Sequence, residues 1–202
     1  MPKTTTRRRP KVYLAGPEVF VRTAQALGAA KVEICARYGL QGVYPLDGQA
    51  DVSHLPLAEQ GYAIARANEG LMLDCAAGIA NLTPFRAAGM DVGTAYEIGF
   101  MRGHGKPVFG YTNSQLSFFE RVVKFNGGRL SRRSAKYPGF AFEDDRNMGV
   151  EEFEFTENLM IESAIHESGL PIVKGKTKRA DRYTDPTAFE ECVKQAAAVL
   201  LG

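Results

Sequence analysis

The chain has 202 residues, of which 45 % are hydrophobic and 24 % are charged, which fits one globular domain better than two independent cores. Its formal net charge is +2, so no overall field recruits nucleic acid or a membrane. No apolar run approaches the roughly 18 residues of a membrane span. Residues 1–10 lack the apolar core of a secretion signal, so we expect a disordered basic arm. Cys35, Cys75 and Cys192 have no metal-binding spacing and indicate a reducing cytoplasm.

Strands and helices alternate between residues 11 and 111. Apolar runs predict strands at 11–16, 42–46, 77–82 and 106–111, and helical spacing predicts helices at 20–38, 57–73 and 92–103. Beyond residue 111 we expect a short helix within 113–121, an irregular insert at about 125–149, helical character over 151–167, a strand at 171–173 and a helix at 186–201. This order predicts a single α/β domain over residues 11–202, with a parallel five-stranded sheet and helices on both faces.

Parallel sheets of this kind bind ligands at the carboxyl ends of their strands. One segment that follows a predicted strand there carries two carboxylates: Asp91 stands just before a predicted helix, and Glu97 lies six residues further on. Side chains so placed face the same crevice. A glycosyl-transfer site needs one carboxylate to attack or stabilise C1′ and a second group that orients the sugar or handles the leaving base.

The same residues also have a purely structural interpretation. Thr94 to Glu97 matches the S/T-x-x-E capping box, in which the glutamate closes on the helix start. Asp91 fits an ordinary N-cap, and Gly93 fits a tight turn. On this pattern alone the capping interpretation is favoured.

Four separated segments favour the functional interpretation of Asp91 and Glu97 over the capping one. VYLAGP, NLTPFR, DVGTAYEIG and EFTENLMIE occur in this order, and together they resemble the nucleoside 2-deoxyribosyltransferases from about Lys11 to Tyr111 and again at Glu154–Glu162. The resemblance implies a flavodoxin-like (Rossmann-like) fold. It also implies transfer of a 2-deoxyribosyl group between nucleobases through a covalent glycosyl intermediate, with hydrolysis as a side reaction. The implied ligands are 2′-deoxynucleosides and free nucleobases, and the implied reaction needs no metal or organic cofactor.

The resemblance also assigns roles to individual residues. Glu97 matches the nucleophile, Asp91 matches the acid that holds the deoxyribose, and the Tyr13 hydroxyl matches the group that hydrogen-bonds the nucleophile. Asn158 matches an asparagine that a neighbouring subunit contributes, which implies a homo-oligomer, either a dimer or a multiple of dimers. Further residues expected to bind substrate are Gly16, Phe20, Asp74, Asn81, Phe85, Arg86, Gly93 and Met160.

Some assignments remain open on the sequence. The family's aspartate before the third strand is replaced by Ala76, which leaves Asp74, Asp47, Asp51 and Asn81 as alternatives for the acid that protonates the leaving base. Phe20 and Phe85 would form the apolar walls of the base pocket, although a core position is favoured for Phe20. Arg86 is expected either to touch the substrate or to pair with Asp91.

Three other functions each fit part of the sequence. A hydrolase of deoxynucleoside 5′-monophosphates is disfavoured because Pro17 removes an N–H donor and Glu18 adds negative charge after the first strand. A non-catalytic nucleoside-sensing module would explain Ala76 but not the retained Tyr13, Asp91, Glu97 and Asn158. A nucleic-acid surface on the basic, aromatic residues 125–146 is offset by the acidic residues that follow.

Overall fold

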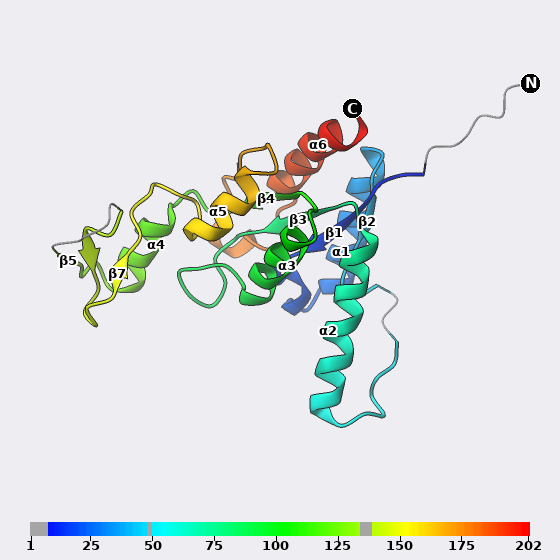
Figure 1. Ribbon diagram of the computed structural model, residues 1–202, viewed down its shortest axis with the longest axis horizontal. Helices are drawn as coiled ribbons and strands as arrows, with labels where there is room; N and C mark the ends of the chain where they lie inside the picture. Colours follow the sequence, from blue (N-terminus) through cyan, green and yellow to red (C-terminus); the bar gives the residue numbers. More distant parts are fainter. Residues whose placement is uncertain (1–7, 48–49, 134–138) are drawn as a thin grey trace, which may run out of the picture.

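The computed structural model describes residues 8–47, 50–133 and 139–202 (Figure 1). Five strands form the predicted parallel sheet, in the order β2-β1-β3-β4-β8. They are β1 (Lys11–Ala15), β2 (Gln41–Val43), β3 (Ala77–Asn81), β4 (Val108–Thr112) and β8 (Val173–Lys174). The expected fold class is therefore confirmed. The expectations for residues 1–7 and 134–138 lie outside the described residues.

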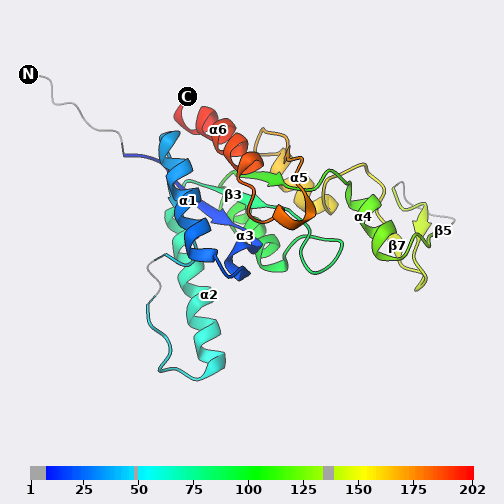
Figure 2. The same ribbon diagram turned by 180° about the vertical axis from the view of Figure 1, so that it is seen from behind.

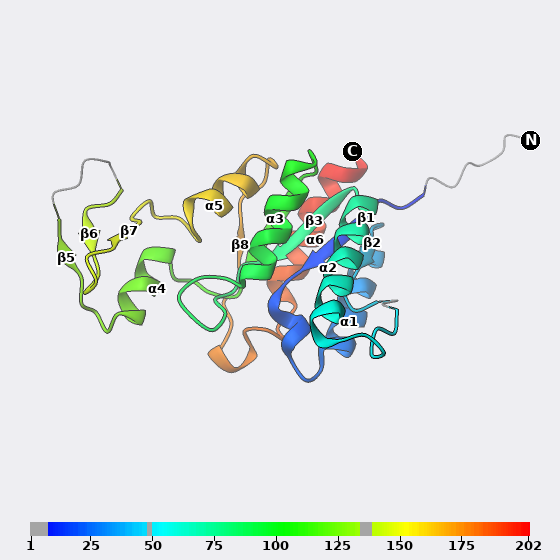
Figure 3. The same cartoon turned by 60° about the horizontal axis from the view of Figure 1, so that its bottom comes forward.

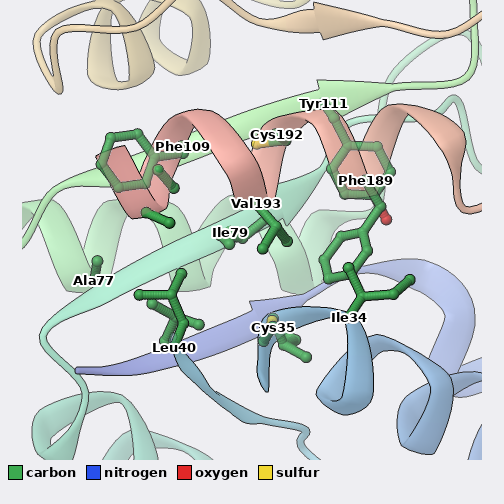
Figure 4. Packing of buried hydrophobic residues seen from close by; sticks show 14 of the residues in the cluster. Ile34, Cys35, Leu40, Ala77, Ile79, Phe109, Tyr111, Phe189, Cys192 and Val193 are labelled. Atoms are coloured by element: carbon green, nitrogen blue, oxygen red, sulfur yellow. The ribbon is translucent and has the colours of Figure 1, made fainter. Parts of the chain in front are cut away.

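Side chains alternate between the two faces of the sheet, as a strand's period of two requires. On one face, Val12, Leu14, Ile79 and Phe109 pack in one core cluster with residues of α1 (Ala24–Arg37) and α6 (Thr187–Leu201). Figure 4 shows the side chains of both helices closing around Ile79. Because both faces are covered, β3 and β4 are buried along their whole length.

The other face carries Tyr13 of β1. It packs in a second cluster with residues of α2 (Leu57–Asp74), α3 (Val92–Gly103) and α5 (Leu159–His166). Two glycines let these helices approach closely: a Cβ at Gly78 would lie 2.8 Å from Met101 Sδ, and one at Gly110 would lie 2.7 Å from Ile165 Cδ1. Figure 2 shows α1 and α6 from the opposite side.

Several element boundaries differ from those expected. The helix expected at 20–38 is split, because a short 3-10 helix, η1 (Pro17–Phe20), comes first and α1 begins only at Ala24. The helix expected over 151–167 is shorter, because Asn158 caps α5 and residues 151–158 are not helical. The helix expected within 113–121 is α4 (Phe118–Phe125), which starts late because Ser117 and Glu120 form a capping box.

The insert at 125–149 is less irregular than expected. It contains β5 (Ser131–Arg132) and β6 (Phe142–Glu143), and β6 is the central strand of a small antiparallel sheet, paired with β5 on one side and with β7 (Gly149–Val150) on the other. Figure 3 shows this sheet and α4 projecting from the main body. The remaining element is a short 3-10 helix, η2 (Arg179–Asp181). Within the described residues, no helix combines the length and apolar character needed to cross a membrane.

Candidate active site

Tyr13 and Glu97, the two residues expected at the centre of the site, contact each other. Tyr13 projects from β1 toward the face covered by α3, and its hydroxyl donates a 2.6 Å hydrogen bond to Glu97 Oε1. Tyr13 is fully buried and Glu97 is partly buried. A glutamate in the second turn of α3 is thereby fixed by a residue 84 positions away in the chain.

The surroundings of Glu97 shift its ionisation toward neutral pH. Burial is the largest effect and raises the pKa of its carboxyl, the hydrogen bond from Tyr13 lowers it, and the nearby charge of Asp91 raises it again. The net result is a pKa of about 7. Burial and the charge of Glu97 also raise the pKa of Tyr13, so this hydroxyl remains a donor. Glu97 is therefore poised between a neutral and a charged form at physiological pH.

Asp91 has the structural role that its position indicates. It is the N-cap of α3, and its Oδ2 accepts from the Thr94 amide at 2.9 Å and the Thr94 hydroxyl at 3.0 Å. The expected capping box from Thr94 to Glu97 is wrong, because Thr94 lies inside the helix and Glu97 pairs with Tyr13. Gly93 contributes by its small size: a Cβ there would lie 3.1 Å from Asp91 Oδ2.

An aromatic stack lies on neighbouring loops at the carboxyl ends of β1 and β3. The rings of Phe20 and Phe85 are 5.3 Å apart and nearly parallel, and the Arg86 guanidinium lies 4.5 Å from the centre of the Phe85 ring. Phe20 is 57 % exposed, so the favoured core position was wrong. Arg86 has no carboxylate partner among the described residues, which excludes the expected pair with Asp91 in this structure. Its φ of 59° is uncommon for a residue other than glycine and often marks functional loops.

Sequence reasoning missed Tyr183, which holds this loop from the C-terminal segment. Its hydroxyl donates a 2.6 Å hydrogen bond to the Pro84 carbonyl, and its ring packs edge-on against Phe85 at 6.1 Å. No local motif surrounds Tyr183, so only the folded chain reveals this contact.

Gly16 and Asn81 belong to a buried polar cluster around Glu18. Asn81 Nδ2 donates to Glu18 at 2.9 Å, and Lys31 forms an ion pair with the same carboxylate. Burial raises the pKa of Glu18, but the Lys31 charge and its hydrogen bonds outweigh burial and hold it below the usual value. A Cβ at Gly16 would lie 2.0 Å from Glu18 Oε2, so Gly16 makes room for this carboxylate.

This cluster lies away from Glu97. Asn81 shares the strand parity of Ile79, whose side chain faces α1 and α6, whereas Tyr13 and Glu97 meet on the other face. Asn81 Oδ1 also accepts from the Thr83 amide at 2.9 Å. Asn81 therefore binds Glu18 and shapes the loop after β3, on the face of the sheet opposite Tyr13.

Asp74 and Ala76 lie at the wrong edge of the sheet. Asp74 ends α2 and lies 3.8 Å from Lys11, the first residue of β1, and the Ala76 amide donates to the Lys11 carbonyl. Both positions are at the amino ends of the strands, opposite the ligand-binding edge. Asp74, which was expected to bind substrate, and Ala76, which replaces the family's aspartate, therefore both lie away from the edge at which such sheets bind ligands. Asp47 and Asp51 are exposed in the loop after β2.

A buried ion pair holds the loop that carries Asp91. Arg121 of α4 contacts Glu157 at 2.6 Å, and both side chains are at most 5 % exposed. Arg121 also donates to the Ala88 carbonyl at 2.7 Å, and Glu157 accepts from the Met90 amide at 3.1 Å. The loop end next to Asp91 is thus fixed to α4 and to the segment before α5.

Asn158 and Met160 follow this ion pair directly. Asn158 Oδ1 accepts from the Met160 amide at 3.0 Å, and its Nδ2 donates to Glu151 at 2.5 Å. Met160 is 69 % exposed. Within one chain Asn158 acts as a helix cap, and a contribution to a second subunit stays a prediction.

A protein family and a relative of similar length match this chain in sequence. Residues 12–160 match the family described as nucleoside 2-deoxyribosyltransferase. The chain is 39 % identical over 206 residues to the uncharacterized protein C191.05c of Schizosaccharomyces pombe, covering 99 % of this chain and 94 % of the relative.

Two solved structures share the fold. A 2-desoxiribosyltransferase from Leishmania mexicana has a TM-score of 0.56 at 21 % identity, with coverage of 92 % of this chain and 97 % of the other. A conserved protein from Enterococcus faecalis V583 has a TM-score of 0.55 at 20 % identity, with coverage of 93 % and 99 %. Since the family match spans well over half of its residues, the chain belongs to the nucleoside 2-deoxyribosyltransferase family.

Proposed function

We propose that this protein transfers the 2-deoxyribosyl group of a 2′-deoxynucleoside from one nucleobase to another, with Glu97 as the nucleophile. The observation that carries the proposal is the partly buried Glu97 carboxylate held by Tyr13, with a pKa of about 7. A carboxylate so fixed is aimed without the entropy cost of ordering a free side chain. Membership of the family supports the same assignment.

The reaction proceeds in two displacements. Ionised Glu97 attacks C1′, the C1′–N bond breaks, and its electron pair leaves with the base, which takes a proton from water. The intermediate is a glycosyl ester of Glu97. A second base attacks C1′, the ester C1′–O bond breaks to release the Glu97 carboxylate, and the base gives its N–H proton to the hydroxide left by the first step, which restores the original anomer. Water in place of the second base gives hydrolysis.

Neighbouring residues orient the substrate. Asp91 is rigid because Thr94 holds its Oδ2, and its Oδ1 receives no hydrogen bond from a described residue, so it can accept one from a deoxyribose hydroxyl. Its negative charge also stabilises the positive charge that develops at C1′. Phe20 and Phe85 provide a flat apolar surface for the base, and Arg86 provides donors at its edge. This reaction uses no metal or organic cofactor and would serve nucleotide salvage in the cytoplasm.

A homo-oligomer, a dimer or a multiple of dimers, would complete the site. Large apolar side chains are exposed beside it: Val92 is 84 % exposed, Tyr96 56 % and Met160 69 %. α3 and α5, which carry these residues, pack against each other, so an apolar surface of this kind favours a second copy of the chain. Asn158 on α5 would then reach the site of its neighbour.

The first test is base exchange. The protein is incubated with deoxyinosine plus adenine, and separately with thymidine plus adenine, and new deoxyadenosine is measured by chromatography. The expected result is deoxyadenosine formation that Glu97→Ala abolishes. Free base without deoxyadenosine would indicate a hydrolase, and deoxynucleoside 5′-monophosphates would be assayed next. No turnover of any donor would refute the enzyme assignment.

A second experiment tests whether Asn158 of one subunit completes the site of its neighbour. Inactive Glu97→Ala and inactive Asn158→Ala chains are mixed after partial unfolding and refolding together. Mixed oligomers would contain one site with neither substitution, so activity should return to a fraction of the wild-type value. If both variants are inactive alone and the mixture gains nothing, Asn158 acts within its own chain.

A further inference from the structure

A cavity lies against the loop that carries Phe85 and Arg86. It has a volume of about 580 Å³ and is lined by Thr83, Pro84, Ala87 and Ala88 of that loop, together with residues that follow β4 and β8. Neither Glu97 nor Asp91 lines it. Its volume is within the range of small-molecule sites, and its position at the carboxyl ends of β3, β4 and β8 is where such sheets bind ligands.

The lining of this cavity is strongly cationic. Arg121, Lys124, Arg179 and Arg182 contribute to it, and no aspartate or glutamate does. Arg121 is neutralised by Glu157, but the other three have no carboxylate within 4.0 Å among the described residues. In a chain with a net charge of only +2, three uncompensated cations around one hollow create a local positive potential.

Neutral hydrogen-bonding groups complete the wall. Ser114, Gln115 and Thr177 line the cavity between the cations. Asn113 lines it too, and its Oδ1 is buried without a hydrogen-bond partner among the described residues, an acceptor that water or a ligand hydroxyl would satisfy. Arginine and lysine together with hydroxyl and amide groups are the side chains that bind phosphate oxygens.

We propose that this cavity binds a phosphate group carried by a small molecule of nucleotide size, at a site distinct from Glu97. Lys124 from α4 and Arg179 from η2 supply positive charge from two separate elements of the lining, and Arg182 adds a third charge. The inference does not depend on the proposed transferase reaction. The phosphate has two sources, the 5′-phosphate of a deoxynucleotide donor or a separate phosphorylated effector.

Binding there would affect the candidate active site. Thr83, Pro84, Ala87 and Ala88 form one wall of the cavity, while Phe85 and Arg86 between them form the aromatic stack. The Tyr183 contact to Pro84 joins Arg182 to the same loop. A ligand that orders this loop would therefore change the affinity for the base.

The test is calorimetric titration of the whole protein with pyrophosphate, with deoxyadenosine 5′-monophosphate and with uncharged deoxyadenosine. The variants are Lys124→Gln and Arg179→Gln, which remove charge without touching the Arg121–Glu157 pair. Arg66→Gln on the exposed side of α2 is the matched control, and thermal midpoints verify that all variants fold. We expect both phosphates to bind, with affinity falling about tenfold or more in each cavity variant and unchanged in the control. Raising the salt concentration should weaken binding.

A competition experiment distinguishes the two sources of the phosphate, a deoxynucleotide donor and a separate effector. If the phosphate belongs to a donor, the monophosphate competes with deoxyadenosine, and the cavity variants weaken only the charged ligand. If it belongs to an effector, pyrophosphate and deoxyadenosine bind together. The proposal is overturned if neither phosphate binds wild type at millimolar concentration, or if the control variant weakens binding as much as the cavity variants do. None of these outcomes depends on base exchange.

Discussion

Replacing Glu97 with glutamine should remove activity and yet stabilise the protein at neutral pH. The amide oxygen of glutamine can still accept the hydrogen bond from Tyr13, so the substitution mainly removes a charge that burial disfavours. Loss of the nucleophile should lower kcat by about 10³-fold or more.

The stability gain follows from linkage. The pKa of Glu97 is about 7 in the folded protein, against an ordinary value of 4.5. The folded state therefore binds this proton more tightly than the unfolded state, and wild type loses stability as the pH rises through this range. The loss amounts to about 1 kcal/mol at pH 5 and about 3 kcal/mol at pH 8. Glu97→Gln avoids this loss of stability because glutamine carries no charge at any of these pH values.

Urea unfolding from pH 5 to pH 8 measures this difference. The chain contains no tryptophan, so far-UV circular dichroism is the suitable signal. The free energy of unfolding of Glu97→Gln relative to wild type should grow by about 2 kcal/mol across the range. Glu69→Gln, which alters a carboxylate outside the candidate site that is bonded by Tyr96, is the control for the general effect of removing a glutamate. A difference that stays constant with pH would refute the raised pKa.

The other predictions concern the groups that hold the site. Tyr13→Phe removes the hydrogen bond that lowers the pKa of Glu97, so the rise of kcat/KM with pH should move to higher pH, and an unmoved profile would contradict this. Arg121→Ala leaves Glu157 buried without its partner and should cost about 3–5 kcal/mol in urea unfolding. Arg102→Ala, which breaks an ion pair near the surface, should cost at most about 1 kcal/mol, and similar losses in both variants would mean that the buried pair has no special role.

Much of the fold was predictable because it depends on local patterns. The buried strands read as continuous apolar runs, and the helix at 92–103 was located to the residue, since Asp91 is a strong N-cap signal. The helix expected over 151–167 failed for the same local reason, because Asn158 caps a shorter helix. Helical composition alone could not show that residues 151–158 fold back against α4.

In the candidate site, too, local patterns predicted some residues, and other residues depend on contacts between distant parts of the chain. Asp91 and Glu97 lie within one strand–loop–helix unit, so their spacing placed them on the same side of a helix start, while their roles followed only from the family resemblance. Asn81 was expected to bind substrate, but its side chain lies on the same face of the sheet as that of Ile79 and opposite that of Tyr13. The alternation of side chains along the strand already implied that it shares the face of Ile79. The edge occupied by Asp74 was also implied by its position at the end of a helix that leads into a strand.

Sequence by itself determined the family, through four short motifs that occur in order, and the alternation of strands and helices, because each motif and each element depends on residues close together in the chain. Only the tertiary structure decided the contacts that position the site residues and shift the pKa of Glu97. The bond from Tyr13 to Glu97 spans 84 residues, and that from Tyr183 to Pro84 spans 99. The burial that raises the pKa of Glu97 has the same origin, since it arises only when α3 packs on a sheet assembled from distant strands.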